Sequence, residues 1–331
     1  MIYIKAIIPL AGKGTRLRPH TYSKPKPLLH VAGKPVLGHI LDSLKNLNID
    51  EIIFITGDME DHIVKYVSKN YDYKCTYVKQ NEMLGDGHAI SLAKYNVEED
   101  VIVVFVDTLF VGDIKKDIKN IGDNEGIVWT SKTSDPKRFG IVEIKNDSIV
   151  SIEEKPEHPK SDLAVIGLYY FKDAKKMFNY LEKLHENKIS SKGEYRLADA
   201  MGLMIKDGAK LKSETVDMWL DCGKPETLIE TNRYLLENGK QTVNHYKNCV
   251  INYPVYIENS VFAENSVIGP NVSIARGSKI ISSIVSNSII GEDVIIENTV
   301  LDYSLVGNKA EISYTKKKLN VGDSTQILSS H

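Results

Sequence analysis

The sequence has little of what would tie it to an oxidising compartment or to a membrane. Its 331 residues include three cysteines, Cys75, Cys222 and Cys249, and no two of them have the spacing of a metal site or a redox motif. No apolar run approaches the roughly 18 residues of a membrane span. The apolar stretch at the N-terminus is too short for a signal peptide. We therefore expect a cytoplasmic protein with reduced thiols and no membrane partner.

The chain also lacks an excess of charge of either sign. Its 44 acidic residues nearly balance 42 Lys and Arg residues, for a formal net charge of −2. Nucleic-acid binding and polybasic membrane anchoring both need a basic surface, so we expect neither. The composition, with 42% hydrophobic and 26% charged residues, is that of an ordinary soluble globular protein.

The first two thirds of the chain alternate short apolar runs with helical patterns. Strands are predicted at 2–9, 51–57, 74–78, 101–106, 126–131, 140–144, 148–152 and 165–171. Helices are predicted at 35–47, 59–69, 86–95, 173–187, 195–207 and 225–237. This order predicts an α/β fold, with a Rossmann-like mixed sheet and helices on both faces.

From about residue 248 the pattern changes to a six-residue repeat, with Asn, Ser and Gly between apolar positions. The repeated positions are Phe262, Ile268, Ile274, Ile280, and then Val294, Val300, Val306 and Ile312. One apolar residue per six is typical of a left-handed β-helix, with a small antiparallel β domain as the alternative. We expect a catalytic domain at 1–238, a linker at 239–247 and a β-helix domain at 248–331, with the last dozen residues frayed.

A glycine-rich turn with nearby cations follows the first strand. The stretch LAGKGTRLRPHTYSKPKPLLHVAGKP begins at Leu10. It does not fit a P-loop, and Leu17 stands where a dinucleotide fingerprint needs its third glycine. Backbone N–H groups of Gly12 and Gly14 at the end of a strand can bind phosphate oxygens, and Arg16 and Lys26 add positive charge. The turn suits a di- or triphosphate; taken alone, it could also be a tight turn with solvated basic residues.

As a whole, this stretch closely resembles the signature of sugar-1-phosphate nucleotidyltransferases, L-A-x-G-x-G-T-R-L-x-P followed by P-K-P-L-L and G-K-P. The present sequence has one residue fewer before the first glycine. Other segments resemble the family in the same order: Leu84-Gly85 with Gln80, V-D-T-L-F at 106–110, R-F-G at 138–140, E-E-K-P at 153–156, I-G-L-Y at 166–169, G-E-Y at 193–195 and W-L-D-C-G at 219–223. The resemblance covers most of the first 237 residues and is strongest to glucose-1-phosphate thymidylyltransferases.

The resemblance implies that an NTP and a sugar 1-phosphate give an NDP-sugar and pyrophosphate, by in-line attack of the sugar phosphate on the α-phosphorus. Two polyanions must meet, so catalysis would be mainly charge neutralisation and alignment. The implied catalytic cations are Arg16, Lys26 and Lys155. Asp107 and Asp221 are the implied Mg²⁺ ligands, although either carboxylate alone could be a helix cap or turn residue.

The implied binding residues divide between the two substrates. Those for the nucleotide are Leu10, Ala11, Gly12, Gly14, Thr15, Gln80, Gly85 and Asp107. Those for the sugar phosphate are Gly140, Glu154, Lys155, Val165 and Tyr169. An amide such as that of Gln80 can donate and accept at once, which favours thymine or uracil, so we expect dTTP or UTP with glucose 1-phosphate. Glu154 would bind sugar hydroxyls or else pair with Lys155. A mannose-1-phosphate guanylyltransferase and an inactive binding paralogue are the alternatives.

Three positions depart from the family pattern. Val106 stands where glycine usually precedes the metal aspartate, His30 replaces a proline and Ala198 replaces a threonine. We expect Val106 to crowd the ribose or tilt Asp107. The β-helix is short, and its one histidine is the terminal His331, so we expect no acyltransferase activity there. Its apolar flanks and sheet edges favour a homo-oligomer, a dimer or tetramer.

Overall fold

The computed structural model describes residues 4–239 and 246–313, and the chain forms two compact units, Met1–Thr231 and Asn232–His331. The division falls inside helix α7 (Pro225–Glu237). Most of the linker predicted at 239–247 lies outside the described residues, and so do the last dozen residues of the chain. Among the described helices, none is both long and apolar enough to cross a membrane.

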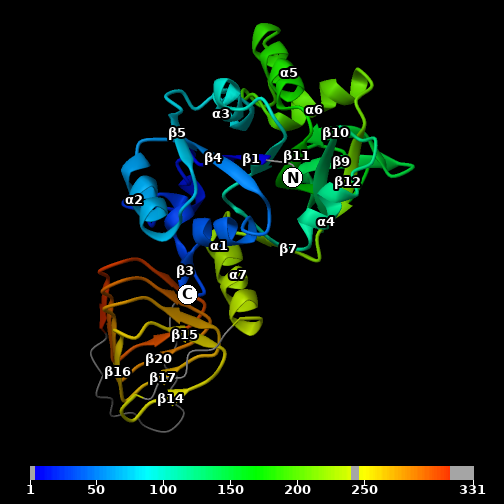
Figure 1. Ribbon diagram of the computed structural model, residues 1–331. Helices are drawn as coiled ribbons and strands as arrows, with labels where there is room; N and C mark the ends of the chain where they lie inside the picture. Colours follow the sequence, from blue (N-terminus) through cyan, green and yellow to red (C-terminus); the bar gives the residue numbers. More distant parts are fainter. Residues whose placement is uncertain (1–3, 240–245, 314–331) are drawn as a thin grey trace. The chain divides into compact units, whose positions relative to one another are not determined.

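A mixed nine-stranded sheet forms the centre of the first unit, in the order β5-β4-β1-β6-β11-β8-β12-β10-β9 (Figure 1). Its strands are β1 (Ile4–Pro9), β4 (Ile49–Thr56), β5 (Cys75–Lys79), β6 (Val101–Val104), β8 (Gly126–Lys132), β9 (Gly140–Lys145), β10 (Ser148–Glu154), β11 (Leu163–Phe171) and β12 (Leu211–Thr215). Parallel pairing of β1 with β4 and β6, and antiparallel pairing of β11 with β6 and β8, confirm the predicted mixed sheet.

Helices cover this sheet, with α3, α5 and α6 packed together above it in Figure 1 and α1 and α2 below it. Their bounds are α1 (Val36–Ser43), α2 (Glu60–Asn70), α3 (Asp86–Ser91), α4 (Ile114–Lys119), α5 (Ala174–Glu186) and α6 (Leu197–Lys206). Helix α5 shows the local cause. The Asp173 side chain caps its first turn by accepting from the Lys176 N–H, and its apolar face buries Met177, Leu181 and Leu184.

The structure adds short elements that the sequence pattern does not predict, α4, β12 and two small two-stranded sheets. These sheets are β2 (His30–Val31) with β3 (Lys34–Pro35), and β7 (Thr108–Val111) with β13 (Met218–Asp221). The strand predicted at 101–106 ends at Val104, because the chain turns through 105–107 and the Thr108 N–H donates to the Phe105 carbonyl at 3.2 Å. This turn places Asp107 at the edge of the sheet.

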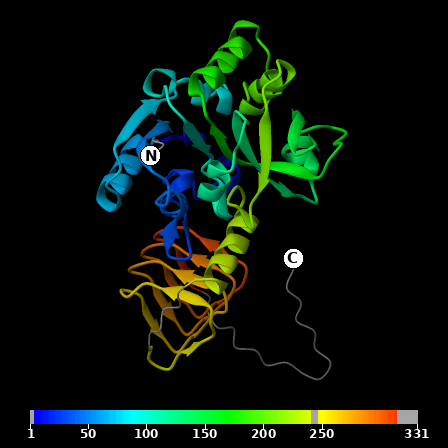
Figure 2. The ribbon, with the colours of Figure 1, turned by 45° about the vertical axis from the view of Figure 1, so that its right-hand side comes forward.

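The second unit carries a left-handed β-helix, whose stacked coils are visible in Figure 2. Three parallel four-stranded sheets form its sides. The first contains β14 (Val250–Ile251), β17 (Val267–Ile268), β20 (Ile284–Val285) and β23 (Val300–Leu301). The second contains β15 (Val255–Ile257), β18 (Val272–Ile274), β21 (Ile289–Ile290) and β24 (Leu305–Val306). The third contains β16 (Phe262–Glu264), β19 (Lys279–Ile281), β22 (Ile295–Glu297) and β25 (Glu311–Ser313).

The repeated apolar positions do not all face the same way. Ile268, Ile274, Ile280, Val294 and Val306 are buried, and Ile312 packs partly buried against them. Phe262 and Val300 are 50% and 72% exposed, so these two repeat positions face outward. The pairing register explains this, because Val250, Val267, Ile284 and Val300 stack at spacings of 17, 17 and 16 residues, short of the 18 that three six-residue repeats would give. The neighbouring Ala263 and Leu301 face inward instead.

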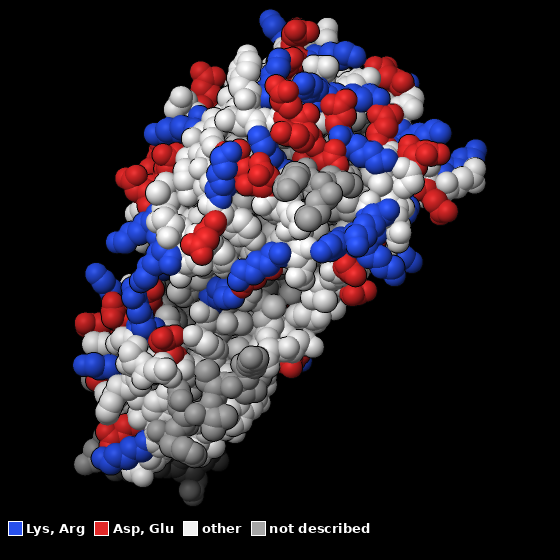
Figure 3. Space-filling model, in the orientation of Figure 1, with Lys and Arg blue, Asp and Glu red and all other residues white. Residues whose placement is uncertain are grey.

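The surface agrees with the near-zero net charge. On the face drawn in Figure 3, Lys and Arg side chains are interspersed with Asp and Glu side chains over the first unit. The face in view has no broad region of a single sign. This arrangement is consistent with the expectation that positive charge gathers locally, around a small ligand.

Candidate functional site

A pocket of about 820 Å³ lies in the first unit, where the carboxyl ends of β1 and β6 meet. Its wall includes Pro9 and the glycine-rich turn that follows β1, and the residues 105–108 that follow β6. In open α/β sheets this edge is the usual place for a ligand.

The pocket brings together almost all of the predicted site residues. Those that line it are Ala11, Gly12, Gly14, Thr15, Arg16, Lys26, Gln80, Gly85, Asp107, Gly140, Glu154, Lys155, Val165, Tyr169 and Asp221. Leu10 is the exception, because it is 5% exposed and its N–H donates to the Ile55 carbonyl beneath the turn. Leu10 thus supports the turn from below.

The glycine turn has two glycines with different requirements. Gly14 has φ +59°, and an added Cβ would lie 3.0 Å from Thr21 Cγ2 and 3.1 Å from Lys26 Cβ. Conformation and packing therefore both require glycine at this position. No described atom lies within 4 Å of an added Cβ on Gly12. Packing does not explain Gly12, whereas a ligand approaching the bare backbone would.

The two predicted metal ligands meet through the small β7–β13 sheet. These strands are antiparallel and pair Thr108 with Asp221, while the Cys222 N–H donates to the Asp107 carbonyl at 2.9 Å. The pairing places two carboxylates, more than a hundred positions apart in sequence, at the same end of one ribbon. Both line the pocket.

Two cations surround the Asp107 carboxylate. Lys26 Nζ lies 2.8 Å from Oδ2 and Arg16 Nη2 lies 3.9 Å from the same atom. Burial alone would raise the pKa of Asp107, but Lys26 and then Arg16 outweigh it and hold the pKa below its ordinary value. Asp107 is therefore ionised at neutral pH.

Gly223 lets Asp221 and Arg16 approach the same point. The Asp221 Oδ1 accepts from the Gly223 N–H at 2.7 Å. An added Cβ on Gly223 would lie 2.8 Å from Asp221 Oδ1 and 3.2 Å from Arg16 Nη2. In the described part of the chain, no group of three or more His, Cys, Asp or Glu residues could hold a metal. Two carboxylates do fit Mg²⁺, which commonly takes one or two of them and completes its shell with substrate phosphates and water.

The opposite end of the pocket is built from β9, β10 and β11. The β9–β10 register pairs Gly140 with Glu154, and an added Cβ on Gly140 would lie 2.9 Å from Val165 Cγ2 and 3.1 Å from Glu154 Oε2. Lys155 has φ +48°, a costly conformation for a residue other than glycine, and its Nζ lies 3.2 Å from Glu154 Oε1. The predicted alternative of a Glu154–Lys155 pair is therefore present, at the pocket wall.

Gln80 presents less to a ligand than its side chain allows in principle. Its Nε2 donates to the Gly85 carbonyl at 3.2 Å and contacts His88 Nδ1 at 3.0 Å. Burial lowers the pKa of His88, so the ring is neutral and its Nδ1 can accept. Both amide hydrogens are thus used within the protein. Its carbonyl oxygen is what a base can meet, and that Gln80 both donates to and accepts from a base stays a prediction.

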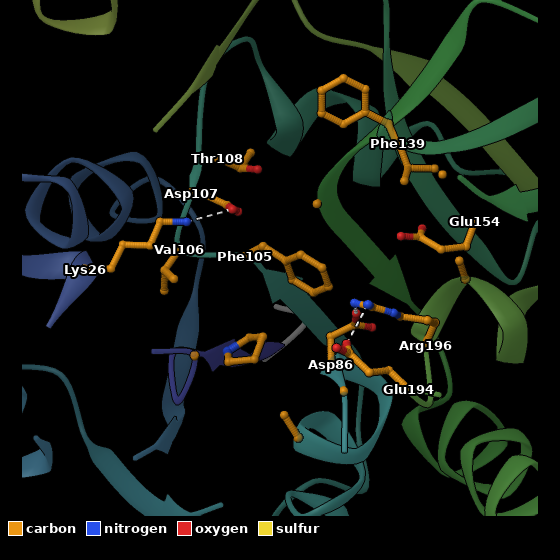
Figure 4. A pocket seen from close by; sticks show the side chains of 18 of the residues that line it. Lys26, Asp86, Phe105, Val106, Asp107, Thr108, Phe139, Glu154, Glu194 and Arg196 are labelled. Carbon is orange, nitrogen blue, oxygen red and sulfur yellow. Dashed lines mark hydrogen bonds and ion pairs between the residues drawn. The ribbon is translucent and has the colours of Figure 1, made fainter. Parts of the chain in front are cut away.

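The sequence reasoning missed an ionic cluster in the pocket wall, shown in Figure 4. Asp86 accepts from Arg196 Nη1 and from the Leu197 N–H, both at 2.8 Å, and Arg196 also pairs with Glu194. Burial would lower the pKa of Arg196, but Asp86, Glu194 and Glu154 together raise it. In the sequence, Asp86 and Arg196 appear only as opposite charges near the starts of two predicted helices. The fold shows that these two side chains contact each other.

Phe105 is a second residue that the sequence reasoning missed. Its ring lies 5.7 Å from that of Tyr169, edge to face, and both residues line the pocket. The preceding β6 run is apolar throughout, so a further apolar residue gave no signal of a site.

Comparisons with known proteins identify the family of the chain. The family model described as nucleotidyl transferase matches residues 5–238. A glucose-1-phosphate thymidylyltransferase of Streptomyces griseus is 28% identical over 95% of this chain and 90% of its own length. The bifunctional protein GlmU of Methanocaldococcus jannaschii is 36% identical over 76% of this chain, and the match spans 60% of that relative.

A solved structure from Bacillus anthracis, provisionally named a glucose-1-phosphate thymidylyltransferase and in complex with a sucrose, has a TM-score of 0.62 and 30% identity, over 70% of this chain and 94% of that one. A UDP-glucose pyrophosphorylase complexed with UDP-glucose has a TM-score of 0.64 over 72% of this chain and all of that one; at 23% identity it supports the fold alone. With a family model covering most of the chain and a pocket at the expected sheet edge, the protein belongs to the nucleotidyl transferase family of enzymes.

Proposed function

We propose that this enzyme is a sugar-1-phosphate nucleotidyltransferase, which converts an NTP and a sugar 1-phosphate into an NDP-sugar and pyrophosphate. The observation that carries the proposal is that Lys26 and Arg16 lie beside Asp107, with Asp221 close to the same Arg16 side chain, in one pocket of about 820 Å³. The name of the Streptomyces griseus relative, which aligns over almost the whole chain, supports the same reaction.

The phosphate-binding residues act by neutralising charge. The backbone around Gly12 and Gly14 would bind the triphosphate, Arg16 the leaving pyrophosphate and Lys26 the phosphate that is attacked. Lys155 reaches the pocket from the other end and would hold the attacking sugar phosphate. A sugar phosphate is already ionised near neutral pH, so the reaction needs alignment and charge screening, with no base to activate the nucleophile.

Asp107 and Asp221 are the residues that would hold Mg²⁺. When bound, the ion supplies positive charge to phosphate oxygens of both substrates and lowers their repulsion. Lys26 keeps Asp107 oriented and ionised. The Gly223 N–H holds one oxygen of Asp221 in place.

The preferred substrates are dTTP or UTP with glucose 1-phosphate. The Gln80 carbonyl oxygen can accept the imide N–H of thymine or uracil. Glu154 can accept hydrogen bonds from sugar hydroxyls beside Tyr169, which is 2% exposed.

A pyrophosphate-release screen tests this proposal. It crosses dTTP, UTP, GTP, CTP and ATP with glucose-, mannose- and N-acetylglucosamine 1-phosphate, in the presence of Mg²⁺. We expect the fastest release from dTTP or UTP with glucose 1-phosphate. Fastest release from GTP with mannose 1-phosphate would reassign the substrates, and nucleotide binding without release in any combination would indicate an inactive paralogue.

We also propose that the protein self-associates through the first sheet of its β-helix. The outward positions there are Val250, Val267, Ile284 and Val300, of which Val250, Ile284 and Val300 are 56%, 46% and 72% exposed. No Lys, Arg, Asp or Glu takes an outward position in the described strands of that sheet. A two-fold interface sets a patch against itself, so an uncharged apolar patch can pair without like-charge repulsion.

The other two sheets are less suited to this role. The second sheet is contacted by helix α7. Asn232 of this helix is fully buried, donates to the Asn271 carbonyl and accepts from the Ser273 hydroxyl. The third carries charged outward residues such as Lys279 and Glu311. Light scattering of the full chain tests the proposal, with an oligomer expected for the wild type, a monomer for Val300→Glu and no change for Lys279→Glu. A monomeric wild type or an oligomeric Val300→Glu would contradict it.

A further inference from the structure

Residues 105–107 line the pocket, and the side chains of Phe105 and Val106 point in different directions within it. Figure 4 shows Phe105 directed towards Arg196 and Asp86, and Val106 on the side of Lys26. Phe105 packs on Tyr169, in the half of the pocket that contains Glu154. Val106 therefore belongs to the half that contains the glycine turn.

The proposed nucleotide contacts bracket Val106 in that half. In the proposed function the phosphates would lie by Gly12 and Lys26 and the base by Gln80 and Gly85, all of which line the pocket. The part of a nucleotide between its phosphates and its base is the pentose. An isopropyl group facing the pentose offers no hydrogen bond to a hydroxyl and fills volume that a glycine would leave open.

The backbone beneath Val106 is fixed, so the side chain cannot easily retract. The Phe105 N–H donates to the Gly167 carbonyl at 2.8 Å, and the Cys222 N–H donates to the Asp107 carbonyl at 2.9 Å. On the β11 side an added Cβ on Gly167 would lie 2.9 Å from Phe105 Cβ, which leaves no room for the turn to shift that way. A group that collides with Val106 is therefore displaced by it.

From this geometry we propose that Val106 determines sugar specificity within the nucleotide and selects 2′-deoxyribose over ribose. The inference rests on the proposed function and refines it, because it favours a deoxynucleoside triphosphate over its ribo counterpart. An apolar wall discriminates against one added hydroxyl by at most about a hundredfold, so we expect a preference of about ten- to a hundredfold in kcat/KM.

The test separates the 2′-hydroxyl from the 5-methyl group, because dTTP and UTP differ in both. It measures kcat/KM for UTP, dUTP, 5-methyl-UTP and dTTP with a saturating sugar 1-phosphate. For the wild type we expect dUTP to exceed UTP, and dTTP to exceed 5-methyl-UTP, by the same factor. Equal use of the deoxy and ribo forms by the wild type would overturn the proposal by itself.

Three variants assign the effect to Val106. Val106→Gly should bring both ratios to within about threefold of unity, mainly by improving the ribonucleotides, and Val106→Ala should give an intermediate ratio. Val106→Thr keeps the shape and replaces a methyl group by a hydroxyl, so it should also improve the ribonucleotides. Val111→Ala, at the exposed end of β7 and outside the pocket wall, is the matched control and should keep the wild-type ratios.

The outcomes distinguish the two levels of inference. If no nucleotide gave pyrophosphate release, the proposed function itself would be contradicted. Turnover with unchanged ratios in Val106→Gly and Val106→Ala would remove the role of Val106 alone. A change in the Mg²⁺ requirement that is equal for all four nucleotides would mean that Val106 tilts Asp107, which also contradicts the proposal.

Discussion

The two ends of the pocket differ in the chemistry of their residues and in where those residues lie in the sequence. The phosphate end consists of bare backbone and cations, Gly12, Gly14, Arg16 and Lys26, all from one continuous stretch of chain. The sugar end combines carboxylates and aromatic rings with the cations Lys155 and Arg196, each paired with a carboxylate. These residues come from β9 to β11 and from the starts of α3 and α6.

This difference orients the substrates. Arg16 and Lys26 at one end would attract phosphate groups, whereas Asp86, Glu154 and Glu194 at the other can accept hydrogen bonds from hydroxyl groups. Under the proposed function, a sugar 1-phosphate would enter with its phosphate towards Asp107 and its ring towards Glu154. The contrast yields tests in which damage at one end should leave the other substrate's binding intact.

The largest effect is expected at the junction of the two ends. Asp107→Asn and Asp221→Asn each remove a carboxylate that would bind Mg²⁺. Because that ion would reduce the repulsion between the two phosphate groups, turnover should fall at least about a thousandfold. Pyrophosphate release across a Mg²⁺ titration measures this. Asp113→Asn, an exposed helix cap, is the control. Near-normal turnover in either test variant would show that the ion lies elsewhere.

Arg16→Met should cost about a hundred- to a thousandfold in kcat, typical of a lost electrostatic stabiliser. The sugar phosphate should keep its KM, because Arg16 belongs to the phosphate end. Steady-state kinetics with each substrate varied in turn measure both quantities. Arg18→Met, an exposed neighbour two residues away, serves as the comparison and should change little. A raised KM for the sugar phosphate would show that Arg16 also binds that substrate, contrary to the prediction.

Glu154→Gln should raise KM for the sugar 1-phosphate about tenfold and leave KM for the NTP unchanged. A neutral amide keeps the shape but accepts hydrogen bonds from hydroxyls more weakly than a carboxylate does. Kinetics with glucose 1-phosphate varied at saturating NTP measure this change. Glu153→Gln, the exposed neighbour, is the matched variant. If the NTP constant moved equally, Glu154 would not belong to the sugar end.

The smallest catalytic effect, with a measurable effect on stability, is expected for Asp86→Asn. Asp86 accepts from Arg196 and from the first N–H of α6, so it ties the segment of Gln80 and Gly85 to the sugar end. Loss of its charge should lower the free energy of unfolding by about 2 kcal/mol and shift both KM values two- to fivefold. Denaturant unfolding measures the first, with Asp61→Asn in the first turn of α2 as the control. A change confined to one substrate would refute the coupling.

The phosphate end was predictable because its residues are neighbours in sequence. Gly12, Gly14 and Arg16 form a pattern whose chemistry can be read without knowing the fold. The cluster of Asp86, Glu194 and Arg196 was not, because its charges are brought together by two helix starts that lie far apart along the chain. Local sequence shows a charge at each site, but pairing depends on the tertiary fold.

The fold itself shows the same limit. Continuous apolar runs located the buried strands β1, β4 and β6, because burial on both faces leaves a strong pattern. The short β7 and β13 left none, since each has only four residues and a partly exposed surface. In the β-helix the six-residue repeat was recognised. Its coils have 16 or 17 residues, not 18, so two of the repeat positions, Phe262 and Val300, face outward.

The pairing of β7 with β13 also has a consequence for the newly made chain. Asp107 emerges from the ribosome long before Asp221, and the ribbon that unites them cannot close until residues 218–221 have followed. A nascent or truncated polypeptide therefore carries only half of the acidic pair. The proposed pair of metal ligands can therefore assemble only after residues 218–221 have left the ribosome and paired with β7.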